Sequence, residues 1–438
     1  MFNYTTVTDE MDHRTQTYNQ KVDRWVYGSV TRGVTTFNSL LASLPGVYPS
    51  VVRESLFRLV QSGKLTNGNS FITHPDPNGT KFPLELRQGF RHQIALPIPH
   101  PLDYDWRFAD SAVRLLLERS LELTTPEDTI VLVGAPTVLR NALESSFPRR
   151  LVLLDSNGEV VTRLVQASSE NSRVILCDVL RDPLPKIEAS LVIVDPPWYE
   201  EHLESFTWAA AQLCQTGGHV LASIPPIGTR PGIERDRERL FEWMERLGLI
   251  KTQLEFGILP YMSPLFEINA LKAEGFHGIL QEWRRGDLGT FVKDQSNSSV
   301  RPAIQTGFED AWVEENIHGV RVRVRYDDCR DFKDPRLVTI VPGGILPSSS
   351  RRDTRRVRAD VWTSGNRVYA CVGRSVLSTI LRALSTNGCP ERVVATKLER
   401  ALTEIELHLV RDAAKQLSEV LTLEQCENQL FAENCQNA

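Results

Sequence analysis

Residues 191–202 read "LVIVDPPWYEEH", and this segment is the most informative of the sequence for the fold. Four apolar residues lead into Asp195, two prolines, a tryptophan and a tyrosine, and an acidic segment follows. A short apolar run that ends at a turn is typical of a strand buried on both faces of a sheet. Because proline fixes the backbone angle φ, the corner after this strand is stiff. A stiff, aromatic corner at a strand end indicates a place where a ligand is positioned.

Similar apolar runs occur on both sides of this strand, separated by segments with helical spacing. Runs of Val, Ile and Leu at such intervals predict parallel strands joined by crossover helices, and hence a doubly wound α/β sheet. The last two runs follow a charged helix and are interpreted as a terminal antiparallel pair. The predicted strands are "TIVLVG" (129–134), "RLVLLD" (150–155), "RVILCD" (173–178), "SLVIVD" (190–195), "HVLASIP" (219–225), "TQLEFGIL" (252–259) and "FEINALKA" (266–273).

Composition restricts the class of protein. A chain of 438 residues, of which 41% are apolar, is expected to form two or three domains. The net charge of -5 provides no overall attraction to nucleic acid, so an anionic partner requires a local basic patch. The seven cysteines include no CxxC pair, which argues against a disulfide framework and against a metal site. No apolar run has the roughly 20 residues of a membrane span, so we expect a cytoplasmic protein without membrane contact.

The N-terminal region carries a pattern of its own. Residues 36–65 predict two short helices around a Pro-Gly turn, and "TNGNSFITH" is typical of a small β wing. The pattern resembles a winged helix, a module that binds nucleic acid in some proteins and packs domains together in others. We therefore divide the chain into an N-terminal region with this module (1–84), the sheet domain (85–275), a basic β-rich region (276–370) and a helical C-terminal region (371–438).

Four of the predicted parallel strands end on a residue suited to ligand binding. In an open α/β sheet, ligands bind outside the carboxyl ends of the strands. Gly134 allows a backbone to pass close to a ligand, Asp155 can accept both hydroxyls of a ribose, and Asp178 can accept an exocyclic adenine amine. Asp195 ends the strand quoted above. The alternative for each aspartate is that it only caps the helix that follows.

Together these strand ends resemble the S-adenosylmethionine pocket of class I methyltransferases, over roughly residues 103–276. The resemblance implies S-adenosylmethionine as the cofactor, bound by the glycine and by the first two aspartates. It also implies that the element before the first strand closes the pocket, here through Trp106 and Phe108. The first loop, "GAPTVL", departs from the glycine-rich turn of the family. The amino-acid end of the cofactor must then be held in another way.

The corner "DPPWY" resembles the (D/N/S)-P-P-(Y/F/W) signature of enzymes that alkylate an amino nitrogen, among them the adenine-N6 methyltransferases. The amino group of adenine is a poor nucleophile, because its lone pair is delocalised into the ring. The resemblance implies that Asp195 and the Pro196 carbonyl accept hydrogen bonds from this amine and orient its lone pair. Pro197 keeps the corner rigid, Trp198 stacks on the base, and Tyr199 completes the catalytic corner.

The sequence leaves more than one acceptor open. The same corner occurs in relatives that alkylate a protein lysine or a polyamine. Tyr261 and Glu267 are placed to contact the substrate, and an additional carboxylate suits a cationic amine. The basic appendage after the sheet favours adenine N6 in DNA or RNA instead. A further alternative is a catalytically silent scaffold that binds nucleic acid or protein.

The appendage is rich in arginine, whose planar fork binds two phosphate oxygens at once. Alternation in "GVRVRVRY" predicts a strand with a basic, solvent-facing side. We expect Arg355 and Arg356 to contact the substrate, with DNA or RNA as the partner and a protein partner as the alternative. The competing interpretation is a solvated face balanced by nearby aspartates, and the oligomeric state is left open. The arginines are Arg321, Arg323, Arg325, Arg330, Arg351, Arg352, Arg355, Arg356 and Arg358.

Overall fold

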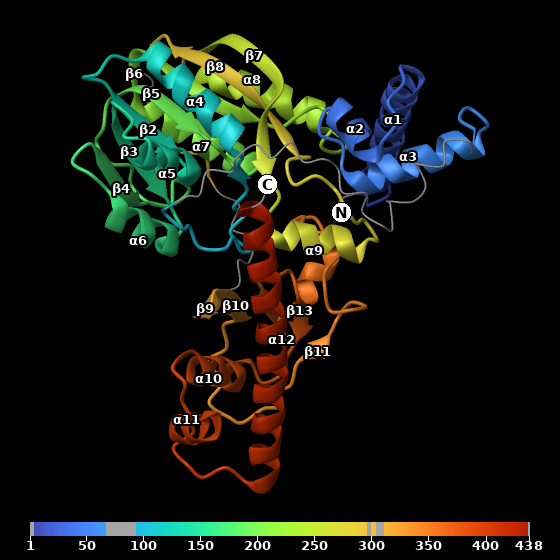
Figure 1. Cartoon of the computed structure of the whole chain (residues 1–438), viewed down its shortest axis with the longest axis vertical. Coiled ribbons are helices and arrows are strands. Elements are labelled where there is room, and N and C mark those ends of the chain that lie inside the picture. Colours follow the sequence, from blue (N-terminus) through green and yellow to red (C-terminus); the bar gives the residue numbers. More distant parts are fainter. Residues whose placement is uncertain (1–3, 67–92, 296–298, 304–310, 437–438) are drawn as a thin grey trace.

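The computed structural model of the chain describes residues 4–66, 93–295, 299–303 and 311–436. Figure 1 shows three parts: a group of N-terminal helices, a sheet covered by helices, and an elongated C-terminal part that includes one long helix. The N-terminal helices are α1 (Tyr4–Thr31), α2 (Phe37–Ser43) and α3 (Pro49–Gln61).

The central sheet has eight strands in the order β1-β7-β8-β6-β5-β2-β3-β4. The strands from β2 to β6 pair in parallel, whereas β8 is antiparallel to both β6 and β7. This arrangement confirms the predicted doubly wound sheet. The strands are β1 (Arg107–Phe108), β2 (Thr129–Val133), β3 (Arg150–Asp155), β4 (Ser172–Leu176), β5 (Ala189–Val194), β6 (Cys214–Ile224), β7 (Leu249–Met262) and β8 (Arg285–Lys293).

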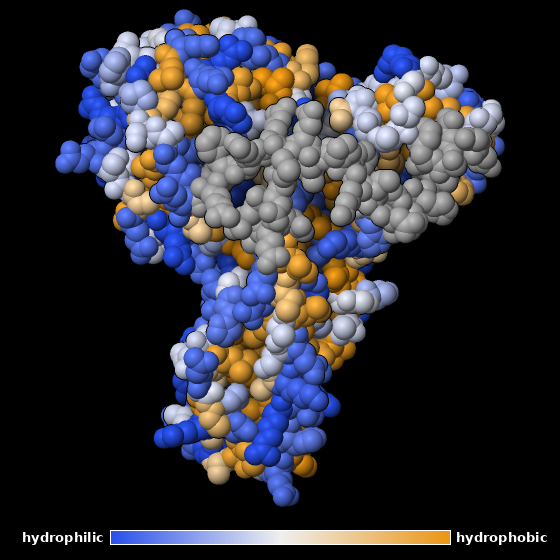
Figure 2. Space-filling model, in the orientation of Figure 1, coloured by the Kyte–Doolittle hydropathy of each residue, from blue (hydrophilic) through white to orange (hydrophobic). Residues whose placement is uncertain are grey.

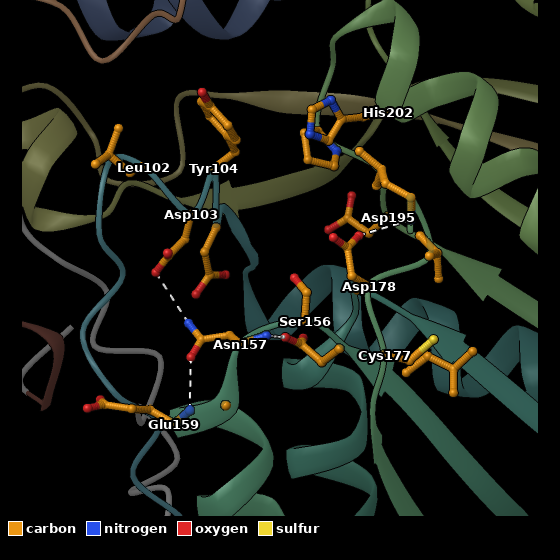
Figure 3. Close-up of a pocket in the computed structure, with 18 of the residues that line it drawn as sticks. Leu102, Asp103, Tyr104, Ser156, Asn157, Glu159, Cys177, Asp178, Asp195 and His202 are labelled. Atoms are coloured by element: carbon orange, nitrogen blue, oxygen red, sulfur yellow. Dashed lines mark hydrogen bonds between the residues drawn. The ribbon is translucent and has the colours of Figure 1, made fainter. Parts of the chain in front are cut away.

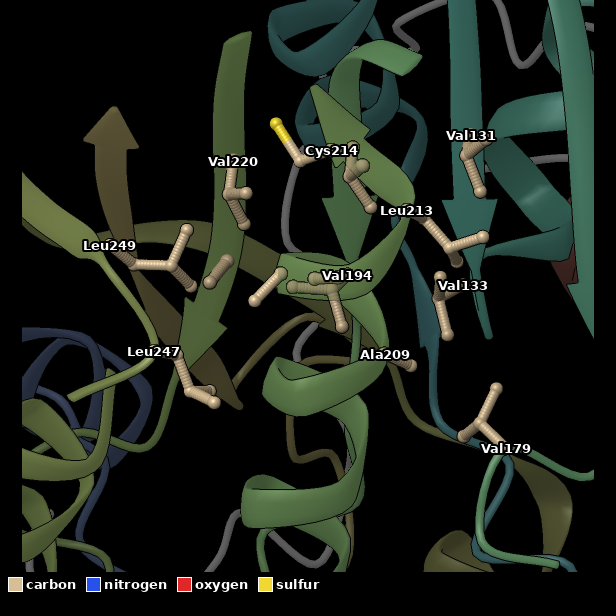
Figure 4. Packing of buried hydrophobic residues seen from close by; sticks show 14 of the residues in the cluster. Val131, Val133, Val179, Val194, Ala209, Leu213, Cys214, Val220, Leu247 and Leu249 are labelled. Atoms are coloured by element: carbon tan, nitrogen blue, oxygen red, sulfur yellow. The ribbon is translucent and has the colours of Figure 1, made fainter. Parts of the chain in front are cut away.

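Helices cover both faces of this sheet, which explains why its parallel strands are largely apolar. On one face Val131, Val194 and Val220 pack in a core with Ala209 and Leu213 of α7 (Figure 4). On the other face α4, α5 and α6 pack on the alternate residues of the same strands. Burying a side chain of this size contributes roughly 1.5–3 kcal/mol. The helices are α4 (Asp110–Leu123), α5 (Pro136–Glu144), α6 (Gly158–Ala167), α7 (Glu200–Leu213) and α8 (Ile233–Arg246).

One predicted strand is a helix. The run "FEINALKA" lies in α9 (Leu265–Ala273), which begins directly after Pro264. The antiparallel partner of β7 is instead β8, which lies past residue 275, where we expected the sheet domain to end. A short apolar run satisfies the spacing of a strand and of a buried helix alike. Here Phe266 and Leu271 are buried on the helix, so the prediction of a strand was wrong.

The N-terminal helices pack against the sheet domain. The two helices predicted around the Pro-Gly turn are present as α2 and α3. Leu40 and Leu56 share a core with Phe276 and Trp283, which lie between α9 and β8 in the sequence. Apart from its first residue, the predicted wing lies outside the described residues. The winged-helix assignment therefore stays a prediction, while the packing of α1 to α3 on the rest of the chain is observed.

The C-terminal part combines an antiparallel sheet, in the order β11-β13-β12-β10-β9, with three helices. Figure 2 shows apolar residues reaching its surface in patches beside hydrophilic ones. Although α12 has 33 residues, no helix in the described ranges is apolar enough over a sufficient length to cross a membrane. The elements are β9 (Trp312–Ile317), β10 (Val320–Arg325), β11 (Val338–Thr339), a 3-10 helix (Thr354–Arg358), β12 (Val361–Thr363), β13 (Val368–Ala370), α10 (Arg374–Ser385), α11 (Pro390–Lys397) and α12 (Glu404–Gln436).

Candidate active site

The four predicted strand-end residues line one cavity. Gly134, Asp155, Asp178 and Asp195 follow or end neighbouring parallel strands, and they enclose a space of about 630 Å³ at the carboxyl edge of the sheet. Figure 3 shows several of its acidic side chains facing this space, together with Tyr104 and His202. We call it the first cavity. Its remaining lining includes Asp103, Asp105, Trp106, Asn157, Glu159, Pro197, Phe206, Glu314, Arg321 and Arg323.

Gly134 is required where the first loop meets the proline corner. Its φ is +67°, a conformation that side chains other than glycine rarely adopt. A Cβ added there would lie 2.9 Å from the Phe206 ring and 3.1 Å from the carbonyl oxygen of Asp195. A single glycine thus allows the loop after β2 to pass close to the corner after β5.

Asp155 lines the first cavity at the end of β3. Its Oδ1 accepts a hydrogen bond from the backbone N–H of Asn157 at 2.8 Å. Burial raises the pKa of Asp155 to about 7, and the neighbouring carboxylates of Asp105 and Asp103 act in the same direction. A buried carboxyl that titrates near neutrality gains from any ligand that offers it hydroxyl groups.

Asp178 also lines the first cavity, but it has local partners. Its carboxylate accepts a hydrogen bond from the Leu180 N–H at 2.9 Å, and Arg181 donates to it at 2.8 Å. No helix lies between β4 and β5 in this described segment, so Asp178 does not cap a helix and its carboxylate instead holds a local turn. Its position on the cavity wall still fits a contact with a ligand.

Asp195 is the buried centre of the site, with 8% of its surface exposed. The hydroxyl of Tyr261 donates a hydrogen bond to its Oδ1 at 2.5 Å, and the Ser223 hydroxyl lies 2.5 Å from the Tyr261 oxygen. Burial raises the pKa of Asp195 well above its usual range, while the hydrogen bonds of Tyr261 and Ser223 lower it. Tyr261, predicted to contact the substrate, is thus also the residue that orients Asp195.

A second cavity, of about 270 Å³, opens on the other side of the corner. Asp195, Pro197, Tyr104 and Trp106 line both cavities, so the two spaces are adjacent at the aspartate. The second cavity has many aromatic walls and three arginines. Its lining also includes Tyr48, Pro101, Pro196, Trp198, Tyr199, Thr229, Arg230, Tyr261, Phe266, Arg284, Ser348, Ser349, Ser350 and Arg352.

The aromatic walls of the second cavity are fixed by contacts with one another. The Trp198 ring meets the Tyr261 ring edge to face, with centroids 5.6 Å apart. The guanidinium of Arg284 lies 3.7 Å from the centre of the Trp106 ring, a cation–π contact. Glu267 is fully buried behind this group and lies 3.8 Å from Arg284.

Four predicted site residues lie outside the lining of both cavities as the structure describes them. Phe108 is buried against the Tyr261 ring, at a centroid distance of 4.9 Å. Glu267 accepts a hydrogen bond from the Ser349 hydroxyl and pairs with Arg284. Arg355 pairs with Asp353 in its own turn, and Arg356 stacks on Trp362. These four side chains make packing or pairing contacts within the protein, and the direct ligand contacts predicted for them stay predictions.

The strand predicted in "GVRVRVRY" is present as β10. The prediction that its basic side faces solvent was wrong. Arg321 of β10 is only 2% exposed, and it donates hydrogen bonds to Asp103 at 2.5 Å and to Glu314 at 2.6 Å. Arg323 pairs with the same two carboxylates. Sequence alternation cannot show that a distant aspartate covers the basic face, because this partner is 218 positions away from Arg321. These arginines form a wall of the first cavity and not a solvent-facing patch.

Sequence reasoning missed several residues of the site. Tyr104, at a φ of +54°, lies between the two cavities and packs against Tyr199 and His202. Arg230 and the serines at 348–350 come from loops that carry no motif. The one available signal was the position of Tyr104 inside the segment "DYDW", between two aspartates and close to Trp106.

Comparison with known proteins identifies the fold. No family model matches the chain, and no curated protein matches it in sequence. A mutein of the branched-chain polyamine synthase from Thermus thermophilus, in complex with N4-aminopropylspermidine and 5′-methylthioadenosine, matches with a TM-score of 0.52 and 12% identity, over 68% of this chain and 96% of that chain. Another structure of that synthase, with the same ligands, gives 0.48 and 14% identity, over 66% and 92%. A putative RNA methyltransferase from Pyrococcus horikoshii gives 0.33 and 17%, over 44% and 89%.

The first of these matches shows that this chain shares the α/β fold of that synthase over about two thirds of its length. At this level of identity the likeness extends to the fold alone.

The Gly134→Ala variant tests whether the close approach at the corner is structural. The left-handed backbone costs alanine roughly 1–2 kcal/mol, and the contact with Phe206 and Asp195 should add roughly 1–3 kcal/mol. Gly257→Ala is the matched control, since Gly257 has a similar φ of +63° and a Cβ added there would meet nothing within 4 Å. Denaturant unfolding should show a clearly larger loss of stability for Gly134→Ala. Equal losses would mean that the approach imposes no constraint.

Proposed function

We propose that the protein transfers an alkyl group from S-adenosylmethionine, or a related adenosyl sulfonium compound, to an amino nitrogen of an acceptor. The observation that carries this proposal is the position of Asp195 where the two cavities meet. One cavity is large enough for the donor, and the other is aromatic and suited to the acceptor. A group that lies between two binding sites can act on both reactants at once.

The residues of the first cavity fit the donor. Asp155 provides a partly buried carboxyl for the two ribose hydroxyls, and Asp178 lies on the wall where an adenine amine could be accepted. Gly134 lines the same cavity at the first loop. The related synthase structure holds 5′-methylthioadenosine, which contains the adenosine and the sulfur of such a donor. The donor supplies an electrophilic carbon bound to a positively charged sulfur.

The proline corner acts on the acceptor. The Asp195 carboxyl is oriented by Tyr261 and has further lone pairs that can accept a hydrogen bond from an amine. The Pro196 carbonyl, in a backbone held by two prolines, is the second acceptor that we assign. Together they direct the nitrogen lone pair toward the first cavity, and ionised Asp195 can take the proton that the amine releases.

Two classes of acceptor agree with this geometry. An adenine base in DNA or RNA would present its N6 amine to Asp195 while its ring stacks on Trp198. A lysine or polyamine would place an ammonium against the aromatic walls. The second class is favoured by the related synthase, whose structure contains N4-aminopropylspermidine. The adenine base as acceptor is favoured by the arginines around the second cavity, because their charges would repel a polycation.

The Asp155→Asn variant tests the donor site. The pKa of Asp155 is raised to about 7, so the carboxyl is partly protonated near neutrality and accepts ribose hydroxyls fully only when ionised. Wild-type affinity for S-adenosylhomocysteine should therefore rise with pH through about 7. The variant should bind about tenfold more weakly and lose this dependence, because an amide does not titrate. Calorimetric titration over a range of pH measures both the affinity and its pH dependence. A variant that keeps the wild-type pH profile would contradict the assignment.

The Asp195→Asn variant separates chemistry from donor binding. An amide cannot take the proton of the amine, so transfer of labelled alkyl group to pooled DNA, RNA, peptides and polyamines should fall by at least about 10²-fold. The affinity for S-adenosylhomocysteine should stay near that of the wild type. Unchanged transfer in this variant would remove Asp195 from the mechanism. If the wild type neither binds the donor nor labels any acceptor, the scaffold alternative takes the place of the enzyme.

The Tyr261→Phe variant tests the orientation of Asp195. The Tyr261 hydrogen bond favours the ionised carboxylate and lowers its pKa, so its loss should raise the pKa further. Since ionised Asp195 is the active form, the acidic limb of the pH–rate profile should move to higher pH. Ser223→Ala should move it in the same direction by a smaller amount. If the acidic limb of the pH–rate profile stays in place or moves to lower pH, Tyr261 contributes only packing and does not tune the Asp195 carboxyl.

A further inference from the structure

The second cavity contains a group of cationic and hydroxyl side chains apart from the proline corner. Arg230 and Arg352 both line this cavity, as do Thr229 and the serines at positions 348–350. The residues come from the loop between β6 and α8 and from the loop before the 3-10 helix. No part of the amine chemistry described above requires them.

Arg230 has hydrogen-bonding capacity that the protein leaves unused. Its Nη2 donates to Asp236 at 2.6 Å, whereas its Nη1 is buried without a hydrogen-bond partner among the described residues. A buried donor that has lost water and gained no partner destabilises the folded protein. A ligand that accepts a hydrogen bond from Nη1 would remove this cost.

Arg352 adds a second positive charge beside Arg230. Burial lowers the pKa of Arg230, and the charge of Arg352 is the next contribution in the same direction. The Arg352 guanidinium lies 5.2 Å from the centre of the Tyr199 ring, and it has no carboxylate partner within the part of the chain that the structure describes. Because both guanidinium groups line the second cavity, an anion bound there would interact with two positive charges.

The hydroxyl groups on the same wall are positioned by their own loop. The N–H of Ser350 donates to the Ser348 hydroxyl at 3.1 Å, and the N–H of Arg352 donates to the Ser350 hydroxyl at 3.2 Å. Hydroxyl groups that accept from the backbone in this way can still donate their own hydrogen to a ligand. The loop therefore brings further donors to the space beside the two guanidinium groups.

We infer that Arg230 and Arg352, with the hydroxyls of Ser348 and Ser350, bind a phosphate group carried by the acceptor. The inference rests on the proposed function, because it takes the second cavity to be the acceptor site. Guanidinium forks match the oxygens of phosphate and bind it in two places. The aromatic walls provide stacking for a ring on the same molecule. The acceptor is then a nucleotide unit and not a free polyamine.

The test is a calorimetric titration of the whole chain with adenosine 5′-monophosphate, adenosine and spermidine, with methylthioadenosine present in excess to fill the first cavity. The monophosphate should bind at least about tenfold more tightly than adenosine, since a hydrogen bond to a charged group is worth roughly one order of magnitude or more in affinity. Spermidine should bind more weakly than the monophosphate. The preference for the phosphate should fall as salt is added.

Arg230→Gln and Arg352→Gln should each bring the affinity for the monophosphate close to that for adenosine. Arg239→Gln is the matched control, because Arg239 lies on the nearby helix α8 and pairs with Glu200 on the surface. It should retain the wild-type preference. Circular dichroism and thermal melting show whether the variants are folded. Inorganic phosphate should compete with the monophosphate in the wild type and in Arg239→Gln, but not in Arg230→Gln or Arg352→Gln.

Equal binding of adenosine and its monophosphate would overturn the inference, as would tighter binding of spermidine or no binding of any phosphate-bearing probe. The titration measures binding and not transfer, so its outcome is independent of the Asp195 assay. Phosphate binding without alkyl transfer would keep the subsite and reject the proposed reaction. Alkyl transfer without a preference for phosphate would keep the proposed reaction and reject the phosphate subsite.

Discussion

The hydrogen bond from Tyr261 to Asp195 is the interaction on which the rest of the site depends. A buried carboxyl group is costly unless it is hydrogen-bonded, and this one is held by residues of two other strands, since Ser223 lies on β6 and Tyr261 on β7. The bond ties the corner after β5 to the far half of the sheet. The packing of Phe108 and Trp198 on the Tyr261 ring then fixes both sides of the corner. The position of the aspartate between two cavities follows from this arrangement.

The C-terminal part is joined to the same site by charge. Arg321 and Arg323 of β10 meet Asp103 in the loop that precedes β1, and Asn157 at the start of α6 donates to the same aspartate. Buried ion pairs contribute little net stability, because desolvation offsets the attraction. These ion pairs do, however, specify how β10 lies against the loop that contains Asp103. The small sheet is therefore a wall of the first cavity, which explains why Arg321 and Arg323, which suggested a nucleic-acid surface, are turned inward.

The sequence predicted those parts of the structure that depend on local patterns. The apolar runs that end at Gly134, Asp155 and Asp195 identified the parallel strands and the edge where a site would form. Two features of the structure could not be predicted from such local patterns. The "FEINALKA" run fits a strand and a buried helix equally well, and only packing decides between them. The second cavity combines residues from the N-terminal helices, the sheet and the 348–350 loop, whose proximity arises from tertiary contacts alone.

The proposed reaction requires two reactants to meet at Asp195, and a crystal structure with S-adenosylhomocysteine bound tests this most directly. The ribose should contact Asp155 in the first cavity, and the sulfur should face the opening beside Asp195, with the second cavity left free. A ligand whose sulfur points away from Asp195, or which occupies the second cavity instead, would contradict the proposed reaction. A first cavity that stays empty at saturating ligand would contradict it as well.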